Sequence, residues 1–439
     1  MKIFRKGNNI MKNIRSLQIC SKRWRSSSTV TTQAVSSESI NEFEIAEELS
    51  KGKPYSEVPG PTPLPIIGNT WRMLPIIGPY QISDLANVSY ILYKQYGKIA
   101  KLGNLVGRPD LLFVYDADEI EKVYRQEGDT PFRPSMPCLV KYKSQVRKQF
   151  FGRLPGVVGV HGEPWREFRT KVQKPVLQPQ TVKKYIQPIE EVSDYFIQRI
   201  CMKYIDDAMS RLKTKTSINE NELSLVERIL ANEPDPKTAY VLALDLILVG
   251  IDTISMAVCS MLYQIATRPD EQEKIHQEVI KILPNENDKL DSSKLDKMVY
   301  LKAFIKEVFR IYSTVIGNGR TLQKNMTICG YEIPKGIQLV FPTIVTGNME
   351  EYVTDCKQFK PERWMKQSNG YIHPFASLPY GHGPRMCLGR RFADLEMQVF
   401  IAKLIRSYKL EYHYEPLKYK VTFMYAPDGE LKFKMLKRP

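Results

Sequence analysis

Apolar side chains recur at the spacing of an α-helix along most of the chain. The pattern predicts helices over residues 82–96, 118–126, 182–213, 224–232, 237–267, 270–283, 297–312 and 390–408, and another that opens at 162. Short apolar runs bounded by turn residues predict strands at 100–105, 110–115, 338–341, 411–414 and 421–424, and a hairpin at 331–336. Residues 128–155 carry several prolines and glycines and are expected to be irregular. The sequence thus predicts a mainly α fold with a small mixed β-sheet lobe.

The excess positive charge is concentrated at the start of the chain. The 439 residues carry a net charge of +16, and residues 1–37 contain eight basic side chains and no acidic one. This leader is also rich in Ser and Thr, which predicts a mitochondrial transit peptide over 1–37, a polar linker over 38–53 and one folded domain over 54–439. A disordered basic tail is the alternative. Since no aromatic stacking pattern or basic fold follows, no nucleic-acid partner is expected. No uninterrupted run of 18 apolar residues occurs, so no transmembrane anchor is expected.

One cysteine stands out from the seven in the chain. The cysteines are odd in number and scattered, without a Cys-x-x-Cys pair, which argues against a disulfide framework and structural zinc. Cys387, however, lies in the glycine-rich stretch Tyr-Gly-His-Gly-Pro-Arg-Met-Cys-Leu-Gly at 380–389, directly before a predicted helix. A helix N-terminus favours thiolate over thiol, and glycines let the backbone pass close to a large flat partner. Together these features describe a haem-thiolate ligand, with a buried cysteine in a turn as the alternative.

The stretch at 380–389 resembles the haem-binding loop of cytochromes P-450, Phe-Gly-x-Gly-x-Arg-x-Cys-x-Gly, with Tyr380 in place of Phe. The resemblance implies the cytochrome P-450 fold and haem b, with Cys387 as the iron ligand. Trp165 and Arg169 share a helix face, where an indole N–H and a guanidinium suit a carboxylate. In the family this pair binds a haem propionate, Arg320 matches a second propionate ligand, and Arg385 is a further haem anchor.

A second motif interrupts the long helix predicted over 237–267. An aspartate within an apolar stretch needs a task or a partner. Residues 249–254, Val-Gly-Ile-Asp-Thr-Ile, resemble the oxygen-activating turn of the family. The resemblance implies that Gly250 leaves room for dioxygen and that Asp252 and Thr253 are the catalytic residues, which relay protons. The alternative is a helix kink with a buried, satisfied aspartate.

Other residues receive roles from the resemblance alone. Glu307 and Arg310 lie three apart, and with the later Arg363 they match a buried charged cluster whose role in the family is structural. The family also implies substrate contacts, which we assign to Val315, to Ile316, and to Tyr425 on a turn predicted at 424–426.

The chain is expected to be shortened relative to this family, because Trp165 and Asp252 lie only 87 positions apart. Two to three more helices of ~12–20 residues are expected between them. We infer that a block of roughly 70–90 residues is missing near the join of Ile200 and Cys201. The predicted fold therefore lacks part of the helices between the Trp165 helix and the Asp252 helix.

Two basic pairs predict a partner surface. Lys302 and Lys306 lie four apart on the 297–312 helix, and Arg390 and Arg391 directly follow the cysteine loop. Such residues usually form a solvated face. Mitochondrial-type members of the family have lysines at matching places that dock an acidic ferredoxin, and electrostatic steering explains why charge belongs there.

The sequence is most similar to the insect mitochondrial clan of cytochromes P-450. The resemblance implies monooxygenation of a lipophilic small molecule, either steroid- or ecdysteroid-like or a xenobiotic. Electrons would come from NADPH through ferredoxin reductase and a mitochondrial ferredoxin, with peripheral association at the matrix side of the inner membrane. Two alternatives stay open: a truncated chain that binds haem but is impaired or inactive, and a haem-thiolate isomerase that needs no electrons. The pair Asp252 and Thr253 speaks against the isomerase, because it suits proton delivery to reduced oxygen.

Overall fold

The computed structural model describes residues 52–133, 136–152, 156–189, 224–233, 235–285, 288–366, 368, 370–421 and 424–438. These residues belong to one folded unit that begins at Gly52. The predicted transit peptide, nearly all of the predicted linker and the join of Ile200 and Cys201 lie outside the described residues, as does the predicted helix beyond residue 189. Lys53 pairs with Tyr331 in a sheet, so the last residues of the predicted linker are part of the fold.

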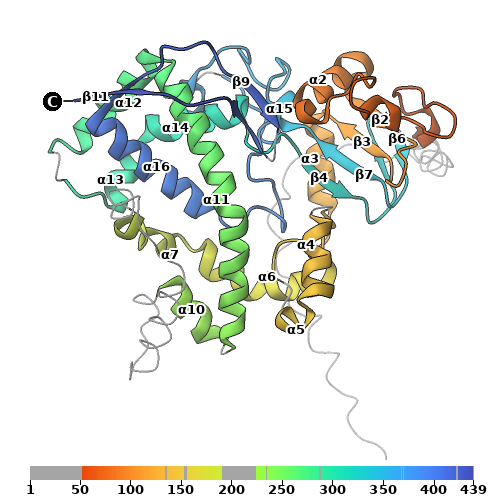
Figure 1. Ribbon diagram of the computed structural model, residues 1–439, viewed down its shortest axis with the longest axis horizontal. Helices are drawn as coiled ribbons and strands as arrows, with labels where there is room; N and C mark the ends of the chain where they lie inside the picture. The colour runs from red at the N-terminus through yellow and green to blue at the C-terminus, as the bar shows by residue number, and fades with distance from the viewer. Residues whose placement is uncertain are drawn as a thin grey trace, which may run out of the picture. The chain divides into compact units, whose positions relative to one another are not determined.

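Helices make up about half of the described chain, and strands far less (Figure 1). The longer ones are α2 (Leu85–Tyr96), α3 (Ala117–Gln126), α6 (Gly162–Leu177), α10 (Leu225–Asn232), α11 (Pro236–Ala266), α12 (Pro269–Ile282), α14 (Val299–Ile311) and α16 (Arg390–Ser407). Shorter ones are α4 (Pro137–Lys141), α5 (Lys148–Phe151), α7 (Pro179–Lys183), α13 (Ser292–Lys297) and α15 (Thr343–Thr346), with single turns at Tyr55–Glu57, Thr70–Met73, Ile82–Asp84 and Pro361–Trp364. The mainly α prediction is confirmed.

Side-chain caps explain where several helices start. The Asp116 carboxylate accepts the amides of Asp118 at 3.0 Å and Glu119 at 3.2 Å, which fixes the beginning of α3. Ser224 forms a capping box with Glu227 at the start of α10, and Asp235 caps α11. These caps use local bonds, so the sequence locates such helix starts closely.

The strands form a small mixed lobe. The largest sheet has the order β2 (Ile99–Leu102), β3 (Leu111–Val114), β7 (Gln338–Phe341), β4 (Asn318–Thr321), in which β3 and β7 run parallel and the other pairs antiparallel. A second sheet joins β1 (Lys53–Pro54), β6 (Tyr331–Ile333) and β5 (Met326–Ile328). Two antiparallel pairs, β8 (Tyr408–Glu411) with β11 (Lys434–Lys437) and β9 (Lys418–Val421) with β10 (Tyr425–Asp428), complete the set.

Helix α11 packs against α12, α14 and α16 and against strands β8 and β10 (Figure 1). One of its faces stays exposed in the described part of the chain: Leu244, Ile247, Leu248 and Ile251 follow the helical spacing and are 36–63% exposed. Among the described residues, α11 is the one helix long and apolar enough to cross a membrane by length and composition. Length and composition also fit the central helix of a globular fold, although only 22% of the apolar window of α11 is buried here.

Several sequence predictions are wrong in detail. Residues 137–151 are helical rather than irregular, running through α4, a π-helical turn at Tyr142–Val146 and α5. The helix predicted from 182 is broken by a turn at 184–185. Strands β8 and β9 each lie three residues before their predicted ranges, the hairpin is made by β5 and β6, and residues 425–426 begin strand β10 rather than a turn. Pairing partners fix these boundaries, and a local apolar run does not reveal them.

Candidate active site

The loop at 380–389 is held in shape by backbone contacts. The Cys387 amide donates to the Tyr380 carbonyl at 2.9 Å. Gly381 and Gly383 have φ values of 72° and 73°, which glycine adopts without strain. A Cβ on Gly383 would also lie 2.6 Å from the Glu127 carboxylate. The turn therefore favours glycine at this position, and any larger residue would also displace the end of the Glu127 side chain.

The Cys387 side chain is accessible, yet protein atoms surround its sulfur. Its side chain is exposed, yet burial raises the pKa of its thiol, against a Gly389 N–H hydrogen bond and the charges of Arg169 and Arg133, which lower it. The sulfur therefore lies in a recess. The Gly389 N–H at the helix N-terminus lowers the pKa of the thiol in the predicted direction, but burial has the larger effect. Metal coordination deprotonates a thiol outright, so a raised pKa is compatible with ligation.

The three predicted arginine anchors all meet the loop or its surroundings. Arg169 donates to the Met386 carbonyl at 2.9 Å, one residue before Cys387. Arg385 stacks with its guanidinium carbon 3.6 Å from the centroid of the Trp165 ring. Arg320 donates to the His382 carbonyl at 3.1 Å. Segments from α6, β4 and the loop are thereby gathered at one site.

Two charged residues at this site were missed by the sequence analysis. Arg133 lies close enough to Arg320 for the two charges to interact, and burial lowers its pKa first of all. Glu127 forms an ion pair with Arg320, and both side chains are buried. Burial raises the pKa of Glu127, partly offset by Arg320. No local pattern marks either residue, since each follows α3 in a segment without a motif.

The site has an excess of buried positive charge. Burial, followed by the charges of Arg320, Arg133 and Arg169, lowers the pKa of Arg385 to about 9. Burial also lowers the pKa of Arg169 to about 10. Four guanidiniums around one carboxylate fit a ligand that brings further carboxylates. Haem b, with an iron for Cys387 and two propionates for the arginines, fits this set of side chains.

The motif on α11 is locally intact. The Thr253 hydroxyl donates to the Val249 carbonyl at 2.8 Å, within its own helix. A Cβ on Gly250 would meet no atom within 4 Å, so the predicted room beside this residue exists. Asp252 is exposed, which removes the alternative of a buried, satisfied aspartate at a kink. Its role in proton relay stays a prediction.

Glu307, Arg310 and Arg363 are brought together in the core. Arg310 donates to both Glu307 oxygens at 3.0 and 2.8 Å, and Arg363 donates to one of them at 3.1 Å. The three side chains are at most 2% exposed. Burial alone would raise the pKa of Glu307, but the Arg310 hydrogen bonds and charge hold it below its ordinary value. This geometry suits the predicted structural role.

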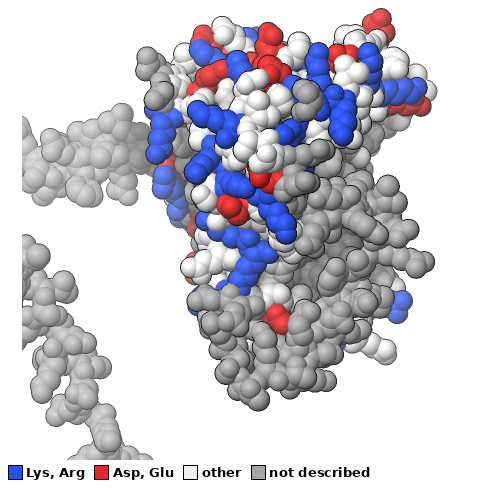
Figure 2. Space-filling view, turned by 90° about the vertical axis from the view of Figure 1, so that its left-hand side faces the viewer, with Lys and Arg blue, Asp and Glu red and all other residues white. Residues whose placement is uncertain are grey.

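The predicted partner residues separate into two groups. Arg390, Lys306 and Arg391 all act electrostatically on Asp394, and Lys306, Arg390 and Arg391 are exposed. Lys302 instead pairs with Asp296 at 3.6 Å. Figure 2 shows a side of the molecule where Lys and Arg side chains gather with acidic side chains between them. The structure thus assembles a basic cluster around Asp394 that does not include Lys302.

Tyr380, which departs from the family motif, also contacts this cluster. Its hydroxyl donates to Asp394 at 2.6 Å, and the Arg390 guanidinium lies 5.5 Å from its ring centroid. The hydroxyl gives the half-buried carboxylate of Asp394 a hydrogen-bond donor that phenylalanine lacks.

The residues assigned to substrate contact lie near one another along the backbone. The Tyr425 amide donates to the Thr314 carbonyl at 2.9 Å, so the start of β10 lies beside the segment that carries Val315 and Ile316. All three side chains are half-buried. Burial raises the pKa of Tyr425 to about 12. Their contact with substrate stays a prediction.

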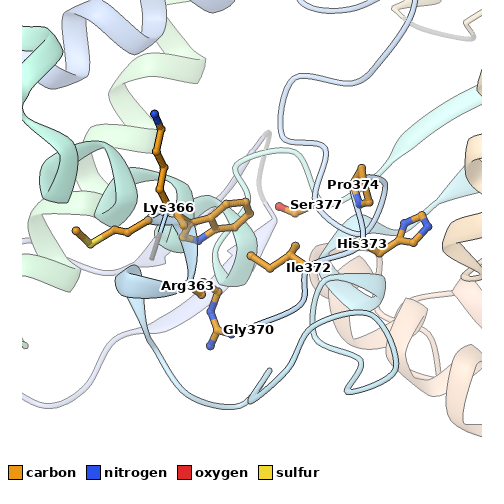
Figure 3. A pocket seen from close by; sticks show the side chains of 9 residues that line it. Arg363, Lys366, Gly370, Ile372, His373, Pro374 and Ser377 are labelled. Carbon is orange, nitrogen blue, oxygen red and sulfur yellow. The ribbon is translucent and has the colours of Figure 1, made fainter. Parts of the chain in front are cut away.

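A pocket of about 360 Å³ lies elsewhere, beside the Glu307 cluster (Figure 3). Two of its polar side chains are already engaged: Arg363 belongs to the cluster, and His373 lies 3.1 Å from Asp118. Nothing in its wall matches the predicted chemistry, so it is not the candidate active site.

An accessible cysteine in a glycine loop, surrounded by arginines at the mouth of a helix, defines the class of haem-thiolate proteins. A cytochrome P450 family model matches residues 197–429. The chain belongs to the cytochrome P450 family, whose members are monooxygenases with haem b as cofactor.

The relatives include three proteins of Drosophila melanogaster. "Probable cytochrome P450 301a1, mitochondrial" is 52% identical, with 88% of each chain covered. "Probable cytochrome P450 49a1" is 37% identical over 93% of this chain and 87% of its own. "Probable cytochrome P450 12c1, mitochondrial" is 26% identical over 89% and 93%. The solved structure of retinoic acid-bound cyanobacterial CYP120A1 superposes with a TM-score of 0.67 and 20% identity, covering 89% of this chain and all of that one, which shows the fold.

The first of these alignments also bears on the predicted missing block. It extends over 486 positions. Since 88% of the 439 residues is about 386, about 100 aligned positions have no residue in this chain. This agrees with a missing block, while its place near Ile200 and Cys201 stays a prediction.

Proposed function

We propose that this chain is a mitochondrial, ferredoxin-dependent monooxygenase that hydroxylates a lipophilic small molecule. The observation that carries the proposal is the accessible Cys387 in its recess, next to Arg169 and with Arg133, Arg320 and Arg385 at the same site. Haem b bound there supplies the oxygen-activating chemistry. One oxygen atom enters the substrate and the other leaves as water, with two electrons from NADPH.

The chain's own residues are assigned distinct tasks in this proposal. Cys387 ligates the iron, and Arg169, Arg320, Arg385 and Trp165 hold the propionates. Thr253 and Asp252 deliver protons from α11. The exposed position of Asp252 supports this task, because a relay needs a group in exchange with water.

The electron donor is proposed to be an acidic mitochondrial ferredoxin. The exposed cluster of Lys306, Arg390 and Arg391 supports this, since it gathers positive charge directly after the cysteine loop. The names of two relatives describe them as mitochondrial, which supports this compartment. We further propose peripheral association with the matrix side of the inner membrane, from which a lipophilic substrate, steroid-like or xenobiotic, would enter.

The central test uses the reduced protein with carbon monoxide. A thiolate-type Soret band, with NADPH consumption that depends on ferredoxin and its reductase, supports the proposal. Cys387→Ser is the matched variant and should lose the thiolate band. Turnover without any electron donor would indicate an isomerase instead.

The docking part has its own test. Lys306→Glu and Arg391→Glu should raise the KM for ferredoxin and leave the carbon monoxide band unchanged, with an effect that weakens as salt screens the charges. Lys302→Glu is the matched control, because Asp296 already pairs with Lys302. An equal effect of all three variants would contradict the assignment of the docking cluster.

A second candidate is a chain that binds haem but is catalytically impaired. The exposed apolar face of α11, from Leu244 to Ile251, favours it, because such a stripe normally packs against another element. A transcript that reads across the Ile200–Cys201 join would establish the short chain as real. Haem uptake with a thiolate band but no ferredoxin-dependent product would then establish the impaired form.

A further inference from the structure

Five tyrosine rings form a continuous line between α11 and the C-terminal strands. The ring centroids are 5.1 Å apart for Tyr425 and Tyr419, and 6.3 Å apart for Tyr419 and Tyr263. They are 5.2 Å apart for Tyr263 and Tyr412, and 5.6 Å apart for Tyr412 and Tyr414. Aromatic rings in contact have centroids ~4.5–7 Å apart. Each ring of this tyrosine line therefore contacts the next.

The two ends of the tyrosine line lie in different surroundings. Tyr425 opens strand β10, which packs against α11, the helix that carries Thr253. The Tyr425 amide is bonded to the carbonyl of Thr314, on the segment that leads into Arg320. Tyr414, at the other end, is 60% exposed. The line therefore connects the elements of the candidate active site with the solvent.

The inner positions of the line hold tyrosine although phenylalanine would fill the same space. The Tyr419 hydroxyl accepts the side-chain amide of Gln264 at 2.7 Å, and Gln264 is itself 1% exposed. The Tyr263 hydroxyl accepts the Leu417 amide at 2.9 Å. A buried hydroxyl needs such partners, whereas a phenylalanine ring needs none. The chemistry that the phenol adds is the release of an electron together with its proton.

Other ring contacts beside the Cys387 loop lead to phenylalanine. Tyr380, whose carbonyl accepts the Cys387 amide, meets the Phe309 ring at 5.7 Å. Tyr124, whose ring also lies beside the loop, meets the Phe341 ring at 5.2 Å. Phenylalanine has no phenolic proton to release and is oxidised far less easily than tyrosine. Among these contacts, the tyrosine line alone presents oxidisable rings as far as an exposed end.

We propose that the tyrosine line is an electron relay that protects the haem site when no substrate is bound. The inference rests on the proposed function as a haem-thiolate monooxygenase. Tyr425 gives an electron and its phenolic proton to the oxidised site, and each ring regains both from its outer neighbour. Tyr414 regains them from a small thiol in solution. Two such transfers turn one activated oxygen atom into water and join two thiols as one disulfide.

The test treats the haem-loaded, substrate-free protein with hydrogen peroxide, which needs no electron donor. We expect a tyrosyl radical by electron paramagnetic resonance, and a spin trap should label Tyr414, as read by peptide mass spectrometry. Tyr412→Phe keeps the ring but interrupts the line, so it should abolish this label. With a small thiol present, the same variant should bleach its Soret band several-fold faster than the parent.

Two further variants separate redox chemistry from packing. Tyr412→Trp changes the packing but supplies an oxidisable indole, so it should restore the label on Tyr414. Tyr371→Phe is the matched control, because Tyr371 is 53% exposed and lies outside the line, and it should behave like the parent. Haem-free protein treated with peroxide should carry no label, because the relay starts at the haem site.

The outcomes separate this inference from the proposal beneath it. If the reduced protein with carbon monoxide gives no thiolate-type band, the proposed function fails and the relay fails with it. If the band forms but Tyr412→Phe keeps the label on Tyr414, the relay is overturned and the proposed function stands. A label that Tyr412→Trp does not restore, or that haem-free protein also carries, overturns the relay in the same way.

Discussion

Breaking the ion pair between Lys143 and Asp245 tests how strongly the segment at 137–160 is attached to α11. The Lys143 ammonium lies 2.5 Å from the Asp245 carboxylate, and the side chains are 5% and 2% exposed. The other carboxylate oxygen accepts the amides of Val157 at 2.7 Å and Val158 at 3.2 Å. A side chain on α11 thereby ties down a segment that also supports the site, because the Val160 carbonyl accepts from Arg385 at 2.8 Å.

Replacing one partner leaves the other buried without its counter-charge. Such a break costs about 3–5 kcal/mol, which exceeds the pair's net contribution to stability. Lys143→Met should cost about 3 kcal/mol, because Asp245 keeps two backbone donors. Asp245→Asn should cost about 4 kcal/mol, because an ammonium stays buried. The double variant contains no buried charge at this place, so its cost should fall below the sum by at least about 2 kcal/mol.

The assay is urea unfolding followed by far-UV circular dichroism, with the rate of haem loss measured in parallel. Lys274→Met serves as control, because the Lys274–Glu362 pair has a similar distance of 2.8 Å but is 47% and 43% exposed. It should cost no more than about 1 kcal/mol. Additive costs in the double variant, or equal costs for Lys143→Met and Lys274→Met, would refute the reasoning.

Three further predictions concern buried polar groups. Burial raises the pKa of Glu396 to about 7. The contribution of the protonated Glu396 to the stability of the folded protein is therefore fully present below about pH 4.5, and it is lost as the pH rises through about 7. At about pH 8 the Glu396→Gln variant should be more stable than the parent by about 2 kcal/mol and melt at a higher temperature, and at about pH 4.5 the two should melt at the same temperature. The same difference in stability at both pH values would contradict this. Arg310→Met should destabilise by about 3–5 kcal/mol, because Glu307 loses a two-point partner, and an unchanged melting temperature would contradict a structural role. Tyr380→Phe should cost about 1–3 kcal/mol through the lost hydrogen bond to Asp394, seen in the same melts; a gain in stability would show that this bond is not needed.

Much of the site was predictable because its motifs are local. The loop around Cys387, the helix of Trp165 and Arg169, and the turn around Thr253 each fix several residues within one short segment. Their spacing carries the chemistry before any folding is known. The cap at Asp116 was predictable for the same reason, since its hydrogen bonds reach only two and three residues ahead.

Other parts depend on contacts that no spacing reveals. Lys143 and Asp245 are 102 positions apart, and Glu127 reaches Arg320 across 193. The helical stretch at 137–151 was predicted to be irregular, because the prolines and glycines of the surrounding range 128–155 outweighed a pattern that tertiary packing completes. Lys302 and Lys306 lie on one helix, yet the nearby Asp296 forms its ion pair with Lys302 and not with Lys306.

The sequence by itself determined the family and most of the order of helices, and it predicted Cys387 as the iron ligand, because short-range spacing and backbone preference decide these. Only the tertiary structure decided that burial outweighs the Gly389 N–H in its effect on the pKa of Cys387, and that Arg133 and Glu127 belong to its surroundings. It alone also showed that one face of α11 is exposed and that a line of tyrosine rings leads from Tyr425 to the exposed Tyr414. Burial and charge pairing depend on which distant segments meet, and that is settled when the whole chain packs.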